Sequence, residues 1–149
     1  MKIKNVIFYI SFLLISSIVS LTPLLANEDA KGVVKERMAN FKMSKKMMQT
    51  IHKSIQNEDF VTIEKSATTL HNWSKEMIKY FPEGSGGGVS DASAKIWKDF
   101  DGFKEAAKKF ELAALSVVEV ANLSDKDAIM AAASTVGDSC KSCHRKFKH

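Results

Sequence analysis

Four segments of the chain carry apolar residues at alternating spacings of three and four, and this pattern strongly limits how the chain can fold. The segments span residues 32–56, 59–81, 93–121 and 125–147. At these spacings the apolar side chains form one stripe along an α-helix, which is buried against helices running nearly parallel to it. Four such helices, joined by two short connections and one longer loop, predict an all-α, antiparallel up-and-down four-helix bundle.

Glycine and proline are scarce, which supports a helical fold. The 149 residues include 7 glycines and 2 prolines, too few for the many turns of a β-sandwich or barrel. The only glycine-rich run is 82–88. It lacks the Gly-Lys-Ser/Thr ending of a phosphate-binding loop and follows no predicted strand. We interpret it as a mobile link between the second and third helices.

The N-terminal segment differs from the rest of the chain. Lys2 and Lys4 precede an apolar stretch of about 14 residues, shorter than the ~20 that span a bilayer. The small Ala26 follows, and then polar residues. This order is typical of a secretory signal peptide cleaved after Ala26, and it predicts export to the periplasm. We therefore divide the chain into a signal peptide, 1–26, and one bundle domain, 27–149.

The charge of the chain gives little support for nucleic-acid binding. The net charge of +5 becomes +3 when the two lysines of the signal peptide are removed. Lysine and arginine are spread along the chain rather than gathered in one basic run. Nucleic acid is therefore not an expected partner.

Both cysteines lie in one short motif, Cys-Lys-Ser-Cys-His at 140–144. C-x-x-C-H is the pattern by which haem is attached covalently. Two thiols three residues apart on a helix can each form a thioether with one haem vinyl group, and the next residue can offer an imidazole nitrogen to the iron. The motif predicts one haem c per chain, bound by Cys140 and Cys143, with His144 as an axial iron ligand.

Other chemistries can use a C-x-x-C pair. A thioredoxin-like dithiol oxidoreductase needs the pair at the start of a helix in a βαβ unit, whereas here it lies near the end of an all-helical chain. A zinc site needs two more ligands, and His52, His71 and His149 match no familiar zinc spacing. A structural disulfide would leave His144 without a role.

The order of these features resembles the class II c-type cytochromes, the cytochrome c-prime family. Three places carry the resemblance: Arg37 followed four residues later by Phe41, the Ile-Trp pair at 96–97, and the segment 137–147 around the motif. The resemblance covers residues 32–148. The family often has arginine at the position of Lys148, and lysine lacks the planar fork of the guanidinium group.

The resemblance implies roles for three residues of the first helix. Arg37 is expected to bind a haem propionate, Phe41 to cover the distal face of the haem, and Met38 to lie near the haem edge. With Phe41 in the distal position, His144 would be the only protein ligand of a five-coordinate iron. Ligation by a methionine, first of all Met38, would instead give the six-coordinate, low-spin centre of the cytochrome c-556-like branch.

The resemblance also implies the function. We expect a periplasmic haem protein that transfers single electrons between redox partner proteins and binds small gases such as nitric oxide. An apolar distal face offers no acid or base, so no enzymatic activity is expected. The family often dimerises, and Met43 and Met47 form a second apolar line on the first helix. We therefore predict a homodimer that packs through the first two helices.

Overall fold

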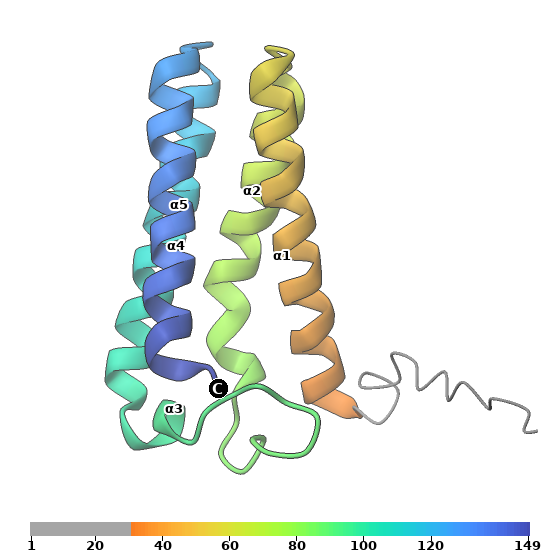
Figure 1. Cartoon of the computed structure of the whole chain (residues 1–149), viewed down its shortest axis with the longest axis vertical. Coiled ribbons are helices and arrows are strands. Elements are labelled where there is room, and N and C mark those ends of the chain that lie inside the picture. Colours follow the sequence, from red (N-terminus) through yellow and green to blue (C-terminus); the bar gives the residue numbers. More distant parts are fainter. Residues whose placement is uncertain (1–30) are drawn as a thin grey trace, which may run out of the picture.

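The computed structural model describes residues 31–149. The predicted signal peptide and its cleavage after Ala26 lie outside the described residues. Four long helices make up the fold: α1 (Gly32–Gln56), α2 (Phe60–Glu76), α4 (Phe100–Ala121) and α5 (Lys126–Phe147). A 3₁₀ turn, η1 (Met77–Tyr80), extends α2, and the short helix α3 (Lys95–Lys98) precedes α4. The helices run alternately up and down, which confirms the predicted four-helix bundle (Figure 1).

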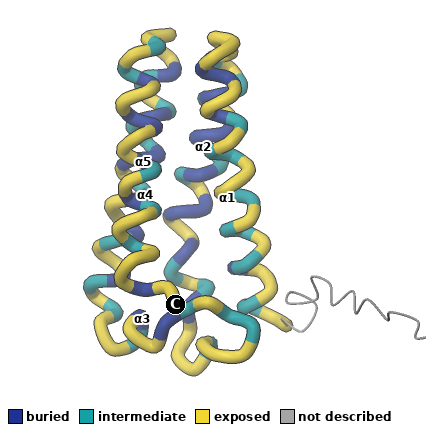
Figure 2. The backbone as a smooth tube through the Cα atoms, viewed as in Figure 1, coloured by how far each residue is buried: buried dark blue, intermediate teal, exposed yellow. Residues whose placement is uncertain are grey.

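The four long helices do not pack equally well against one another. α2 packs closely against α1 and α4, and α4 packs closely against α5, whereas α1 and α5 make few contacts. The buried residues follow the inner side of the helices (Figure 2). They include Ile51, Ile55, Ile63, Leu70, Phe103, Phe110, Val117, Ile129 and Val136. Each such side chain stabilises the fold by about 1.5–3 kcal/mol when it is fully buried.

Helix α1 contributes to the core mainly through its second half. Its buried residues are Ile51, Ser54 and Ile55, together with Arg37 near its start. The apolar side chains between Arg37 and Ile51 are only partly buried. The first half of α1 therefore faces a space that the other helices do not fill.

The predicted third helix, 93–121, is divided at Asp99. The carboxylate of Asp99 accepts a hydrogen bond from the backbone N–H of Gly102 at 3.1 Å, and this bond caps the start of α4. A β-carbon at position 102 would lie 2.5 Å from Asp99 Oδ2, so glycine leaves room for the cap. The prediction of one continuous helix was wrong because the apolar stripe continues across the cap.

The glycine-rich run is attached to the bundle, in contrast to the predicted mobile link. The indole N–H of Trp97 donates to the backbone oxygens of Phe81 and Pro82, at 3.1 and 3.0 Å. A β-carbon at Gly86 would lie 2.7 Å from the Trp97 ring, so the loop approaches this ring as closely as only glycine allows. The loop closes the end of the bundle where the C-terminus also lies (Figure 1).

Candidate haem site

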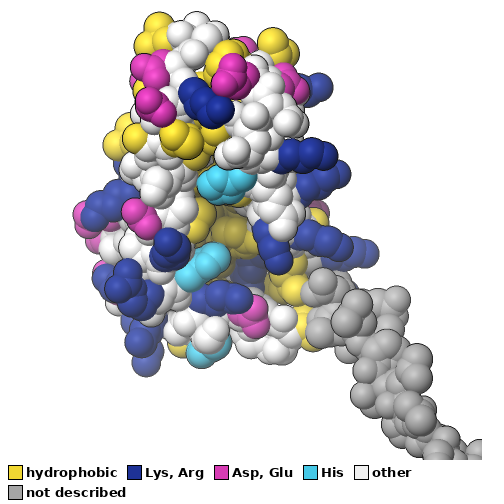
Figure 3. Space-filling view, turned by 45° about the horizontal axis from the view of Figure 1, so that its top comes forward, with side chains coloured by type: hydrophobic (Ala, Val, Ile, Leu, Met, Phe, Trp, Pro, Cys, Tyr) yellow, Lys and Arg dark blue, Asp and Glu magenta, His cyan; other side chains and the backbone are white. Residues whose placement is uncertain are grey.

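A cavity of about 630 Å³ lies between the first half of α1 and the C-terminal half of α5. Its volume falls within the ~300–1,000 Å³ that is typical of ligand and cofactor pockets. Most of the side chains that line it are apolar, and Figure 3 shows a hollow with hydrophobic side chains at its base. The space left by the loose packing of α1 against α5 is therefore shaped as a binding site.

The C-x-x-C-H motif lies on the wall of this cavity. Cys140, Cys143 and His144 all line it from the last two turns of α5. Residues three or four apart share one face of a helix, which is why the motif presents all three side chains together. No disulfide joins the two cysteines.

Burial raises the pKa of both thiols, that of Cys143 to about 11. Cysteines of dithiol oxidoreductases instead have lowered pKa values, commonly at a helix N-terminus. Here the pair lies near the C-terminal end of α5, where the helix dipole disfavours a thiolate. The site therefore gives the dithiol alternative no support.

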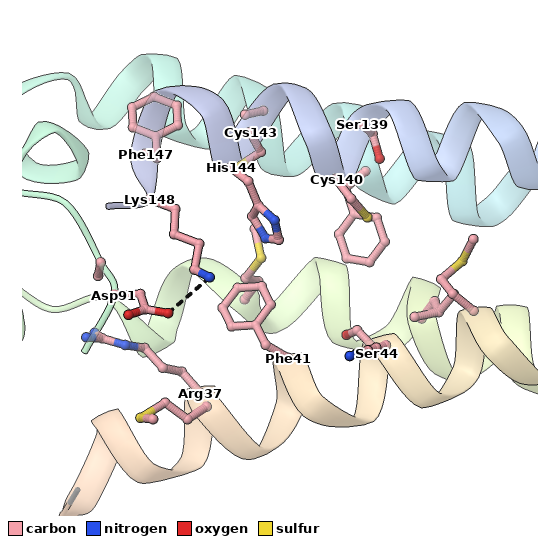
Figure 4. Close-up of a pocket in the computed structure, with 18 of the residues that line it drawn as sticks. Arg37, Phe41, Ser44, Asp91, Ser139, Cys140, Cys143, His144, Phe147 and Lys148 are labelled. Atoms are coloured by element: carbon pink, nitrogen blue, oxygen red, sulfur yellow. Dashed lines mark ion pairs between the residues drawn. The ribbon is translucent and has the colours of Figure 1, made fainter. Parts of the chain in front are cut away.

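His144 and Phe41 face each other across the cavity. They point toward one another from α5 and α1 (Figure 4), with ring centroids 6.3 Å apart. This distance lies within the ~4.5–7 Å range of direct aromatic contacts, so Phe41 would have to move outward to admit a flat cofactor between the two rings. Burial, and then the charge of Lys148, lower the pKa of His144. The neutral imidazole that results can bind a metal ion.

Aromatic side chains of α2 and of the residue that follows η1 pack against Phe41. Its ring packs edge-on against Trp73 at 5.6 Å and against Phe81 at 6.3 Å. Trp73 is buried, and its indole nitrogen is the one buried side-chain polar atom without a hydrogen-bond partner among the described residues. The distal wall is thus apolar and aromatic at the position that the resemblance implies.

Arg37 lines one end of the cavity, and its guanidinium group is engaged by the glycine-rich loop. It donates to the hydroxyl of Ser85 at 2.8 Å, to the backbone oxygens of Tyr80 and Ser85, and to the hydroxyl of Ser90. Its carbon Cζ also lies 4.7 Å from the centre of the Phe81 ring. The expected propionate contact stays a prediction, and no sequence pattern indicated the contacts of Arg37 with the loop.

The C-terminal residues form a second edge of the cavity. Lys148 pairs with Asp91 at 3.0 Å (Figure 4). The backbone N–H of Ser93 donates to the oxygen of Phe147, and that of His149 donates to the oxygen of Asp91, each at 3.0 Å. These bonds fix the residues just after the motif against the loop 91–93. Asp91 is a part of the site that the sequence did not predict.

The other predicted residues are distributed as follows. Met38 lines the cavity beside Arg37, and His52 lines its opposite end. Met43 and Met47 are partly buried and pack against the core, so they do not form the exposed apolar line on which the homodimer prediction partly rested. No group of three or more His, Cys, Asp or Glu side chains within residues 31–149 is arranged to hold a metal ion, so zinc gains no support.

The residues of the cavity fit a covalently attached haem. Two thiols at the spacing of the motif and a neutral imidazole line the same apolar space, and two cationic side chains, Arg37 and Lys148, lie at one end of it. Cations at that end suit the carboxylates of a haem. The fold and the site together define a c-type haem protein built on a four-helix bundle.

Comparisons with known proteins agree with this class. The family model described as Cytochrome C' matches residues 32–148. A cytochrome c' from Rhodospirillum rubrum is 48% identical over 69 residues, which cover 46% of this chain and 47% of that protein, about half the length of each. A cytochrome c-556 from Agrobacterium tumefaciens is 32% identical over 102 residues, 68% of this chain and 81% of that protein.

A solved structure extends the similarity to the fold. It is a nitric oxide complex of a variant of cytochrome c prime from Alcaligenes xylosoxidans, with 25% identity and a TM-score of 0.70. The match covers 78% of this chain and 93% of that chain. This chain belongs to the cytochrome c' family, whose cofactor is covalently bound haem c.

Proposed function

We propose that this chain is a periplasmic haem protein that transfers single electrons and binds small gases such as nitric oxide at a five-coordinate iron. Cys140 and Cys143 hold the haem covalently, and His144 is its only protein axial ligand. Bound haem supplies an iron that changes its charge by one electron and has an open position for a diatomic ligand. The activity is binding and electron transfer, without catalysis of a further reaction.

The observation that carries this proposal is the position of Phe41 opposite His144. A phenyl ring cannot coordinate iron and offers no hydrogen bond to a polar ligand, so such ligands enter at a cost. The nearest hydroxyl on α1, that of Ser44, donates to the backbone oxygen of Asn40 at 2.9 Å and is already satisfied. The distal side therefore favours small, weakly polar gases. The nitric oxide complex of the solved relative supports this assignment.

A second candidate is a six-coordinate electron carrier with a methionine ligand. Met38 lines the cavity one turn before Phe41, and the relative from Agrobacterium tumefaciens is a cytochrome c-556. Met38 lies about 60° around α1 from Phe41, at roughly 100° per residue, so α1 would have to rotate to bring its sulfur opposite His144. The five-coordinate assignment needs only an outward movement of the Phe41 ring.

Location and assembly belong to the same proposal. The signal peptide predicted for residues 1–26 supports export. Within residues 31–149, no helix combines the length and the apolar character that crossing a membrane requires. The homodimer through α1 and α2 is supported by the family resemblance. The redox partners are proteins with which the exposed edge of the cavity makes contact.

Optical spectroscopy of the purified holoprotein tests the iron site. We expect a high-spin ferric spectrum, and a ferrous spectrum that changes when carbon monoxide is added. A low-spin ferric spectrum with a sulfur-to-iron charge-transfer band would show that methionine is bound instead, and ligation by His144 alone would be wrong. Extraction with acid and acetone tests the attachment, because thioether-bound haem stays with the protein. Release of free haem would contradict the roles of Cys140 and Cys143.

A further inference from the structure

The charges of the molecule are divided unequally between α1 and the rest of the bundle. Helix α1 contains six basic residues and one acidic residue, a formal charge of +5. Residues 27–149 as a whole carry +3, because Lys2 and Lys4 precede them. The remainder of this domain is therefore slightly acidic, at −2. The small net charge of the domain conceals one strongly basic helix.

Four of these basic residues form a straight line on the outer side of α1: Lys35, Lys42, Lys46 and Lys53. Their spacings of 7, 4 and 7 residues place them within about 40° of one another around the helix, and along about 27 Å of its axis. All four are exposed. We refer to these four residues as the lysine stripe. Figure 3 shows Lys and Arg side chains on the α1 side of the hollow, and others on the opposite side.

No acidic side chain among residues 31–149 forms an ion pair with the lysine stripe. The structure contains eight ion pairs among residues 31–149, and they involve lysines of α4, of α5, of η1 and of position 148. None involves a basic residue of α1. A line of unpaired like charges creates a positive potential, which attracts an acidic surface and speeds its approach.

The lysine stripe lies beside the cavity that holds the motif. Lys45, which follows Phe41 by one turn, lines the cavity on the same helix, and Lys148 stands at the cavity edge formed by the C-terminus. One side of α1 therefore forms the distal wall of the cavity, while its outer side carries the unpaired charge. A partner that binds the stripe is held beside the exposed edge of the site.

We propose that the lysine stripe of α1 is the docking surface for an acidic protein that exchanges electrons with this chain. This inference rests on the electron-transfer part of the proposed function. A second copy seated on the stripe itself would bring two lysine stripes together, and like charges repel one another, so the proposed homodimer has to use other faces of α1 and α2. A lipid surface is a poorer occupant, because the large exposed apolar side chains lie on other parts of the chain: Val61, Leu112, Leu123 and Met130.

The test measures binding of a fluorescent ten-residue polyglutamate peptide to the holoprotein at low salt. Changing all four stripe lysines to glutamine should weaken binding by about tenfold or more, since each exposed ion pair contributes roughly a factor of two. Binding to the unmodified protein should disappear at roughly 0.5 M salt, where screening acts within about 5 Å.

A matched variant separates the stripe from net charge. The control variant changes four other exposed lysines, on α3 and α4, to glutamine: Lys95, Lys98, Lys104 and Lys108. It therefore removes the same number of positive charges. This control should bind the peptide nearly as well as the unmodified protein. Equal loss of binding in the two variants would show that net charge decides, and would overturn the proposal. Weaker self-association of the stripe variant at low salt, measured by sedimentation, would identify the stripe as part of a dimer interface and overturn the proposal too.

Two further readouts complete the test. The first is binding of the holoprotein to vesicles that contain anionic lipids. If only the stripe variant loses this binding, and the holoprotein does not bind the peptide, the partner is a membrane and the proposal of an acidic protein is overturned. Oxidation of the ascorbate-reduced haem by ferricyanide, followed optically in every sample, tests electron transfer by itself. If the haem cycles but the peptide does not bind the stripe, only the docking inference fails. If the haem does not cycle, the proposed function fails whatever the peptide shows.

Discussion

Replacing Arg37 by methionine should loosen the end of the bundle that carries the glycine-rich loop. Arg37 is 2% exposed and donates four hydrogen bonds to the segment 80–90, which no other side chain of α1 contacts through hydrogen bonds within the described residues. Methionine fills a similar volume and binds none of the four acceptors. The variant therefore removes the bonds with little change in packing.

The magnitude follows from the four bonds and from the burial of the charge. A hydrogen bond to a charged group contributes about 1.5–3 kcal/mol when its partner stays buried. The loop acceptors regain bonds to water when the loop opens, and burial of the guanidinium, which lowers the pKa of Arg37, is itself unfavourable. We therefore expect a loss of about 3 kcal/mol in the free energy of unfolding, or roughly 10 °C in the melting temperature.

Thermal unfolding and amide hydrogen exchange of the holoprotein measure this effect. Exchange at residues 83–90 should accelerate in the Arg37→Met variant, while exchange in α4 follows the global change only. Ser90→Ala, which removes one of the four acceptors, should lose about 1 kcal/mol. A change in melting temperature below ~2 °C with unaltered loop exchange would refute the reasoning. A shift of the haem reduction potential in Arg37→Met but not in Ser90→Ala would show that the charge of Arg37 acts on the haem.

Three further predictions concern the gas site, the cap of α4 and the assembly. Phe41→Ala should speed carbon monoxide binding, measured by flash photolysis. The rate should rise roughly tenfold for each ~1.4 kcal/mol that moving the Phe41 ring adds to the activation barrier of binding. An unchanged rate would mean that Phe41 does not limit entry of the gas. Lys146 and the cap lower the pKa of Asp99, so this carboxylate stabilises the fold above its unfolded pKa of about 3.9 and stops doing so as pH falls through its lower folded value. Asp99→Asn should therefore lower the melting temperature at pH ~7, and this loss should shrink as the pH falls below about 3.9. A loss that does not shrink on acidification would contradict this. A homodimer through α1 and α2 should dissociate less at roughly 0.5 M salt than at low salt, because screening reduces the repulsion between lysines. Sedimentation measures this, and a monomer at micromolar concentration under both conditions would exclude the homodimer.

The sequence predicted the helices well wherever one apolar stripe ran between two polar breaks. The predicted segment 32–56 coincides with α1, and the last predicted segment begins one residue before α5. The third segment was wrong at Asp99, because apolar spacing carries no information about a side chain that turns back to cap its own backbone. The contacts of the loop 82–88 could not be predicted for a related reason. Glycine indicates freedom of the backbone, and the contacts that remove this freedom come from Trp97 and Arg37.

The site residues also differ in how well the sequence predicts them: those close together in the chain could be predicted, and those brought together by the fold could not. Cys140, Cys143 and His144 could be predicted because their spacing alone places them on one face of a helix. The position of Phe41 opposite them depends on how α1 packs against α5, and it came from the family resemblance. The contacts of Arg37 with Ser85 and Ser90 join residues 48 and 53 positions apart in the chain. Serine is common in glycine-rich loops, so no sequence pattern identifies Ser85 and Ser90 as hydrogen-bond partners of Arg37.

Helix α1 explains why binding and folding are linked in this chain. Its second half is held by core residues such as Ile51 and Ile55, whereas its first half is held at Arg37 and otherwise faces the cavity. The apolar lining there gains stability, at about 25 cal/mol per Å², only when something apolar covers it. Haem joined to α5 covers that surface and ties the two least closely packed helices together. The first half of α1 can thus form the distal wall because the core does not cover it, and the outer side of α1 carries lysines that form no ion pair within residues 31–149.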